Sequence, residues 1–146
     1  MKEESRILAY ESISTGMRES HAYTCAAAVY ESFLKAFHDY SPIHVDEAYA
    51  QSRGFAGRVM HGTLLNGFLS HFVGMRFPGR NSLLLSADLR YAQPTYLDDV
   101  ILLEAVVNQK LDANRVIVFD VSFTNQTRNC LAARGRVTVM VKEGST

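Results

Sequence analysis

The sequence predicts an α+β fold in which a curved antiparallel sheet wraps one long central helix. From His61 to Met75 the chain carries no Asp, Glu, Lys or Arg, which is typical of a buried helix. After Arg80 apolar residues recur at every second position, as they do in half-buried strands. A sheet with one apolar face needs a cover, and the charge-free helix is the segment that can provide it.

The length and composition predict one domain, residues 1–146, with 47% hydrophobic residues and a sizeable core. Fifteen basic and fifteen acidic side chains cancel, which argues against nucleic acid or an anionic membrane as a partner. The first residues are polar and contain no apolar signal core. Cys25 and Cys130 fit no metal spacing, so we expect reduced thiols in a cytoplasmic protein.

The elements before the central helix are short. Residues 1–20 predict a polar N-terminal arm, with a strand near residues 7–10 as the alternative. Weak alternation over residues 21–30 favours a strand, although so alanine-rich a run also suits a helix. Two short helices are expected over residues 31–38 and 45–53, and Pro42 separates them because the residue before a proline avoids the helical region.

The central helix is expected to begin at His61-Gly62 and to end at Phe77-Pro78-Gly79. One side is apolar and a second side carries small residues, with Leu65, Phe68, Leu69, Phe72 and Val73 on the first and Thr63, Gly67, Ser70 and Gly74 on the second. This pattern predicts a helix buried nearly all round, with another backbone close to the glycines. An ordinary core helix with two incidental glycines is the alternative. The run is shorter than the about 20 residues that a membrane span needs.

Four strands are expected after the central helix, over residues 83–92, 101–108, 117–123 and 135–141. Turn-forming residues separate the last three, at Asp112-Ala113-Asn114 and from Asn125 to Asn129. Strands joined by short turns form an antiparallel sheet. A single sheet of so few strands leaves an edge exposed, which favours a dimer.

The loop from Asp39 to His44 places a carboxylate and an imidazole five residues apart around a Ser-Pro turn. Such a pair can hold one water molecule and exchange protons with it, which is general acid–base catalysis. The N–H of Gly62, at the start of the helix, could polarise a carbonyl oxygen. Together these groups suit the addition of water to a C=C bond conjugated to a carbonyl. Taken alone, the loop is better explained as a plain turn in which Asp39 caps backbone N–H groups and His44 packs on a surface.

Several segments, in order and at matching spacings, resemble the signature of the MaoC-like dehydratase or (R)-specific enoyl-CoA hydratase family. They are Phe37, 39–46, Ala50, Phe55, 59–64, 77–79, 89–94 and 98–99, and the resemblance covers roughly residues 20–142. It implies a hot-dog fold, a homodimer or larger homo-oligomer, and a role in fatty acid metabolism. The implied reaction is reversible hydration of trans-2-enoyl thioesters to (R)-3-hydroxyacyl thioesters.

The resemblance also assigns roles to residues. It implies that Asp39 is the general base and acid, that His44 positions the water, and that Gly62 donates to the thioester carbonyl. Ser41 and Ser70 are candidate substrate-binding residues: Ser41 stands where the family often has an Asn that holds the loop, and some members have a serine near the pocket at position 70. The acyl carrier, coenzyme A or acyl carrier protein, is part of the substrate. No separate cofactor and no metal is expected, and His61 is expected to be structural.

Two other functions stay open from the sequence. The same scaffold could serve an acyl thioesterase, which also uses a carboxylate and a water. It could instead be a non-catalytic subunit that binds acyl thioesters. The presence of both Asp39 and His44 argues against a pure binder, which has no need of the pair.

Overall fold

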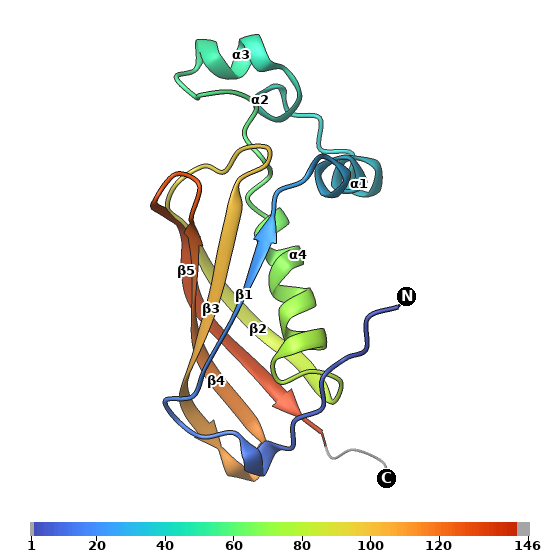
Figure 1. Cartoon of the computed structure of the whole chain (residues 1–146), viewed down its shortest axis with the longest axis vertical. Helices are drawn as coiled ribbons and strands as arrows, with labels where there is room; N and C mark the ends of the chain where they lie inside the picture. Colours follow the sequence, from blue (N-terminus) through green and yellow to red (C-terminus); the bar gives the residue numbers. More distant parts are fainter. Residues whose placement is uncertain (1, 143–146) are drawn as a thin grey trace.

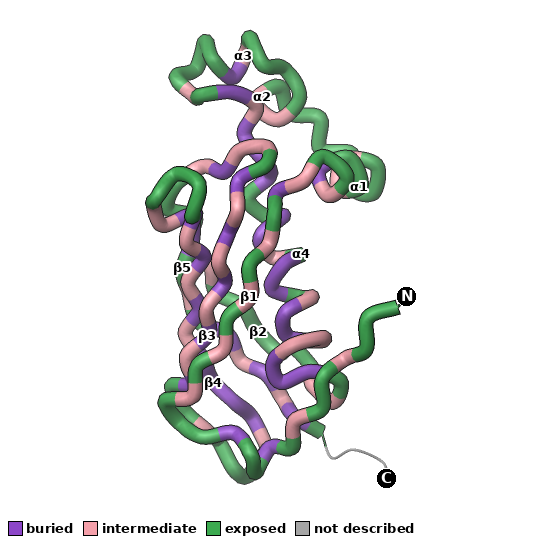
Figure 2. The backbone as a smooth tube through the Cα atoms, viewed as in Figure 1, coloured by how far each residue is buried: buried purple, intermediate pink, exposed green. Residues whose placement is uncertain are grey.

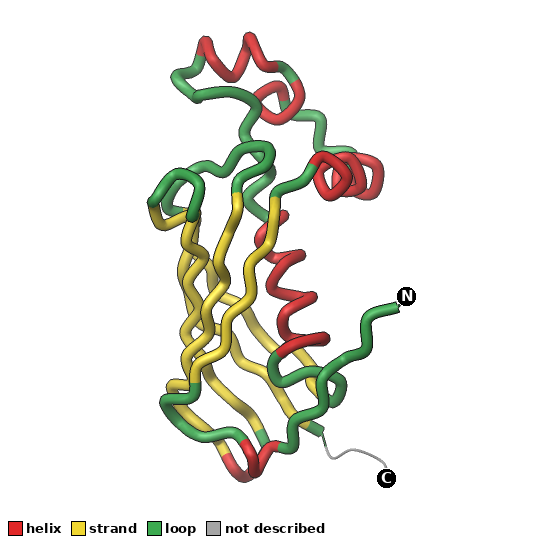
Figure 3. The backbone as a smooth tube through the Cα atoms, viewed as in Figure 1, coloured by secondary structure: helices red, strands yellow, loops and turns green. Residues whose placement is uncertain are grey.

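A five-stranded antiparallel sheet curves around helix α4 in the computed structural model, which describes residues 2–142 (Figure 1). The strand order is β1-β3-β4-β5-β2, and all neighbours are antiparallel. The strands are β1 Arg18–Thr24, β2 Ser82–Tyr91, β3 Val100–Leu111, β4 Val116–Asn125 and β5 Cys130–Val141. The helices are α1 Ala27–Phe37, α2 Pro42–Val45, α3 Glu47–Ser52 and α4 Leu64–His71. The predicted α+β fold is confirmed, and α2 and α3 lie beyond one end of the sheet (Figure 3).

The concave face of the sheet and one side of α4 form the core. Burial alternates along β3, so that Ile101, Leu103, Ala105 and Val107 are buried. They belong to the same cluster as Leu65, Phe68, Leu69 and Phe72 of α4. Burying one such side chain contributes about 1.5–3 kcal/mol, so the sheet fixes α4 and with it the segment that leads into the helix.

The strand predicted over residues 21–30 is wrong in its second half. Strand β1 ends at Thr24, and α1 already begins at Ala27. The alanines there follow their helical preference, because α1 buries Tyr30 and packs Phe33 and Leu34 against the core. Strand β1 starts at Arg18, and the preceding segment makes only an isolated bridge at Ile7 and a 3-10 turn over Tyr10–Ser12.

The prediction that the central helix is buried nearly all round is also wrong for the single chain. Helix α4 begins at Leu64 and continues as a π-helical turn over Phe72–Arg76. Gly67 and Ser70 are exposed, and outside their own helix no described atom lies within 4 Å of where a side chain on Gly67 or Gly74 would begin. Figure 2 shows stretches along α4 that are not fully buried beside the buried ones. The pattern of small residues indicates which side of α4 another segment could approach closely. It does not indicate whether such a segment is present in the same chain. No helix in the described part of the chain is long and apolar enough to cross a membrane.

Strand β2 forms one edge of the sheet and pairs only with β5. Several of its large apolar side chains are exposed to solvent: Leu83 is 50% exposed, Leu85 47% and Tyr91 47%. An unpaired strand edge offers free N–H and C=O groups to another strand. The edge at β2 is therefore suited to continue into a second sheet.

Candidate active site

The loop that carries Asp39 is held between two helices. Helix α1 ends at Phe37, and His38 takes a left-handed conformation, with φ 59°, that turns the chain away. Pro42 occupies the first turn of α2, where its fixed φ and missing N–H suit a helix start. Between them, the N–H of Ser41 donates to Oδ1 of Asp39 at 3.2 Å. This backbone contact orients the carboxylate and leaves Oδ2 available.

His44 lies in α2 and is anchored from two sides. Its Nδ1–H donates to the carbonyl of Val59 at 2.7 Å, and the Tyr30 hydroxyl donates to the His44 carbonyl at 2.6 Å. A proton on Nδ1 leaves Nε2 of the neutral ring with a free lone pair. The side chain is only 13% exposed, so the free Nε2 faces the loop and not bulk water.

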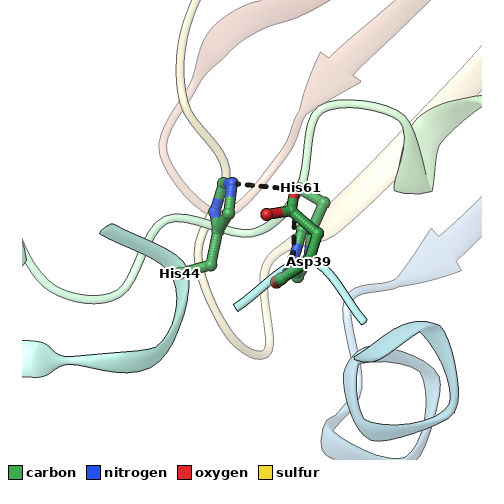
Figure 4. Close-up of side chains that lie close together, drawn as sticks. All are labelled: Asp39, His44 and His61. Atoms are coloured by element: carbon green, nitrogen blue, oxygen red, sulfur yellow. Dashed lines mark hydrogen bonds and ion pairs between the residues drawn. The ribbon is translucent and has the colours of Figure 1, made fainter. Parts of the chain in front are cut away.

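The carboxylate and the imidazole face each other across a short gap. Oδ2 of Asp39 lies 3.7 Å from Nε2 of His44 (Figure 4). This separation is too long for a direct hydrogen bond, yet one water molecule can bond to both acceptors. A water that donates to both has its oxygen lone pairs free to attack. The pair predicted from the loop is therefore brought together with geometry suited to holding such a water.

His61 contacts both members of this pair. Its Nε2–H donates to the main-chain carbonyl of Asp39 at 2.9 Å, and its ring is 2% exposed. The ring centroids of His44 and Phe33 lie 4.0 Å and 4.5 Å from that of His61. These contacts agree with the expectation that His61 is structural, which stays a prediction, and they give it a specific task in positioning Asp39 and His44. Sequence reasoning missed this contact, as well as the contacts made by Tyr30 and Val59.

Gly62 lines a cavity of about 230 Å³ together with His44. Its N–H has no hydrogen-bond partner among residues 2–142, and it lies just before the start of α4, where the helix dipole favours negative charge. A Cβ at this position would lie 3.4 Å from the ring of Tyr91, which is close packing without a clash. Helix α4 begins two residues later than predicted, but the predicted donor is free.

The two serines differ in how they relate to this cavity. Ser41 acts through its backbone N–H, and its side chain makes no hydrogen bond within residues 2–142. Ser70 is exposed on α4, about 12 Å along the helix from Gly62 at 1.5 Å per residue, and does not line the cavity. Substrate binding by either side chain stays a prediction.

Asp39, His44 and His61 also offer ligand atoms that all lie within 4.8 Å of one another, which the spacing in the sequence did not reveal. Their hydrogen bonds do not suit a metal ion. Nε2 of His61 carries the proton donated to the Asp39 carbonyl, and a protonated nitrogen cannot bind a metal. Nδ1 of His61, the unprotonated nitrogen, is buried and has no hydrogen-bond partner in the described part of the chain. The donor set therefore fits a water better than a cation, and the absence of a metal stays a prediction.

The chain belongs to the family described as MaoC like domain, whose model matches residues 10–129. An (R)-specific enoyl-CoA hydratase from Rhodospirillum rubrum is 30% identical over 132 residues, which are 90% of this chain and 90% of the relative. A 3-hydroxybutyryl-CoA dehydratase from Methylorubrum extorquens is 26% identical over 115 residues, covering 79% of this chain and 73% of the relative.

Solved structures agree with this assignment. The unliganded R-hydratase PhaJ1 from Pseudomonas aeruginosa superimposes with a TM-score of 0.84 and 26% identity, covering 92% of this chain and 86% of that one. The (R)-hydratase from A. caviae gives a TM-score of 0.83 at 24% identity, over 90% of this chain and 99% of that one. These neighbours confirm the predicted hot-dog fold.

Proposed function

We propose that this protein adds water to trans-2-enoyl thioesters to give (R)-3-hydroxyacyl thioesters, and catalyses the reverse dehydration. One observation carries the proposal: Asp39 and His44 face each other at 3.7 Å beside a cavity that the free N–H of Gly62 lines. The family assignment and the names of the relatives support the substrate class. The reaction needs only the thioester and water, so coenzyme A or acyl carrier protein takes part as the carrier of the acyl group.

The proposed chemistry follows from these three groups. His44 holds the water through Nε2, and Asp39 removes one proton as the water oxygen bonds to C3 of the enoyl group. The electrons of the C=C bond move to the thioester oxygen, and the Gly62 N–H stabilises the resulting enolate. One such donor is typically worth about 10²–10³ in rate. Asp39 then returns the proton to C2, which completes the addition of one water.

The proposal is tested with purified protein and crotonyl-CoA. We expect the enoyl absorbance to fall and the product to be oxidised by a dehydrogenase specific for (R)-3-hydroxyacyl-CoA. A thiol reagent added to a parallel sample should detect no free coenzyme A. Thiol release without hydration would identify a thioesterase. Binding of crotonyl-CoA with neither reaction would identify a non-catalytic subunit, and either result would overturn the proposal.

We also propose that the chain is a homodimer joined through the β2 edge and located in the cytoplasm. The exposed leucines of β2 support a second copy at this edge of the sheet. In sedimentation velocity we expect twice the chain mass of 16.3 kDa. Leu84→Lys, at a position 39% exposed on β2, should shift the protein to the monomer, since a lysine blocks edge-to-edge pairing.

The matched control is Leu111→Lys at the far end of β3, where Leu111 is 43% exposed. This change adds the same charge to a similarly open leucine away from the free edge, so the dimer should persist. A wild-type protein that sediments as a monomer at micromolar concentration contradicts the proposal.

A further inference from the structure

A second cavity, of about 430 Å³, adjoins the candidate active site. It is lined by residues 56–58 and 96–97, whereas the next residues of the same two segments, 59–60 and 91–95, line the cavity that holds His44 and Gly62. The segments are tied together where the cavities meet, because the Met60 N–H donates to the Thr95 carbonyl at 2.9 Å. The two cavities therefore follow one another along the same pair of segments.

Arg58 lines the second cavity, and its guanidinium lies near Glu47 and the ring of Tyr30. Its Nε lies 3.6 Å from Oε2 of Glu47, and its centre lies 5.2 Å from the centroid of the Tyr30 ring. The side chain is 34% exposed. Within residues 2–142 its two terminal amino groups donate no hydrogen bond. The same Tyr30 anchors His44, so Arg58 is positioned by the scaffold of the candidate active site.

Arg128 reaches the cavity from the turn between β4 and β5 and is held more firmly. Its Nε donates to both oxygens of Asp99, at 3.0 and 2.9 Å, and its guanidinium centre lies 4.0 Å from the centroid of the Tyr96 ring. Asp99 is 1% exposed and also accepts hydrogen bonds from Asn125 and from the Tyr96 N–H. As with Arg58, no partner within the described chain occupies the terminal amino groups of Arg128.

We propose that Arg58 and Arg128 form a phosphate-binding subsite for the carrier of the acyl thioester. The inference rests on the proposed function, since it needs a carrier that bears phosphate. Both arginines line the same cavity, and each has its Nε near a carboxylate and its guanidinium beside an aromatic ring. Within residues 2–142 the terminal amino groups of both donate no hydrogen bond. Planar, pre-ordered guanidinium groups suit bidentate binding of phosphate oxygens. Glu47 pairs with Nε of Arg58, and a bound phosphate would accept hydrogen bonds from the terminal amino groups of the same arginine.

The test compares two substrates with the same thioester and pantetheine arm, of which one also carries the phosphates and the adenosine of coenzyme A. Crotonyl-CoA carries the phosphates, whereas crotonyl-pantetheine has the same thioester and none. For Arg58→Gln we expect kcat/KM for crotonyl-CoA to fall about tenfold or more, as for loss of a hydrogen bond to a charged group, with crotonyl-pantetheine unchanged. The matched control is Arg53→Gln: Arg53 is exposed, its guanidinium lies 4.9 Å from the Tyr49 ring centroid, and it does not line the cavity. It should affect neither substrate.

Arg128→Lys is the second variant, because it retains a cation for the buried Asp99 while removing the planar fork. It should reproduce the selective loss with crotonyl-CoA. Crotonyl-4′-phosphopantetheine shows which phosphate the subsite binds. If the variants also lose kcat/KM with this substrate, the subsite binds the phosphate on pantetheine, which coenzyme A and acyl carrier protein share. If they lose kcat/KM with crotonyl-CoA alone, the subsite binds the nucleotide phosphates. No loss with Arg58→Gln, or an equal loss with crotonyl-pantetheine, would overturn the inference.

Failure of the proposed function gives a different result. If no substrate is hydrated by the wild-type protein, the reaction proposed above is wrong. Calorimetric titration with desulfo-coenzyme A still tests the subsite, because binding should weaken in Arg58→Gln and persist in Arg53→Gln. Equal binding by both variants would overturn the subsite by itself.

Discussion

Replacing Asp39 by asparagine is expected to lower kcat for crotonyl-CoA hydration by about 10²–10⁴-fold, the range for loss of a general acid–base group. The asparagine oxygen can still accept the Ser41 N–H bond, but a neutral amide cannot take a proton from the water. KM should change little, since Asp39 acts on the water and not on the carrier. Initial rates at the enoyl absorbance, measured over a range of substrate concentrations, give both constants.

Asp46→Asn is the control for Asp39→Asn. Asp46 lies in the same region and caps α3 by accepting the Tyr49 N–H at 2.9 Å. Asparagine caps a helix about as well as aspartate, so this variant should keep both the wild-type rate and the melting temperature. The Asp39 side chain is 52% exposed, so Asp39→Asn should also melt like the wild type. A wild-type rate in Asp39→Asn would remove this carboxylate from the mechanism.

His44→Asn is expected to lower kcat by about 10²-fold or more through loss of the Nε2 lone pair. The amide nitrogen of asparagine can take the place of Nδ1 and keep the hydrogen bond to the Val59 carbonyl. The variant therefore separates the role of His44 toward the water from its role in holding α2. Circular dichroism melting should show a folded protein with nearly unchanged stability.

His38→Asn provides the comparison for this second variant. His38 is exposed at the end of α1, where its ring nitrogen lies 3.0 Å from the Lys35 carbonyl, and it takes no part in the site. The rate should stay at the wild-type level. If His44→Asn hydrated crotonyl-CoA as fast as His38→Asn does, the water would not depend on the imidazole and the proposed arrangement would be wrong.

The strands were predictable because their signal is local. Along the first two thirds of β3 and the second half of β4, buried and less buried side chains alternate, and this alternation can be read without knowing any partner. The run from Ala26 to Tyr30 is different, since alanine fits either structure and the outcome depends on what Tyr30 and Phe33 contact. The open side of α4 shows the same limit, because small residues indicate close approach without identifying the partner.

In the candidate site, too, some residues could be predicted from the sequence and others could not. Asp39 and His44 could be predicted because a short loop with a rigid turn brings them together. The residues that hold them are distant in sequence: His61 bonds to the carbonyl of a residue 22 positions earlier, and Tyr30 bonds to one 14 positions later. Side-chain contacts to backbone carbonyls place no demand on the residue type of the partner, so the sequence carries little trace of them.

The hydrogen bond from His61 goes to the main chain of residue 39 and not to its carboxylate. The anchor should therefore survive any side chain at that position. Asp39→Cys would lose the bond from the Ser41 N–H but keep the bond from His61, and would place a thiol against the bound enoyl group. Conjugate addition of its sulfur to C3, with the thiol proton going to C2, would tether the substrate covalently. Such an adduct, visible as added mass in an intact-protein spectrum, would record directly which acyl groups the protein accepts.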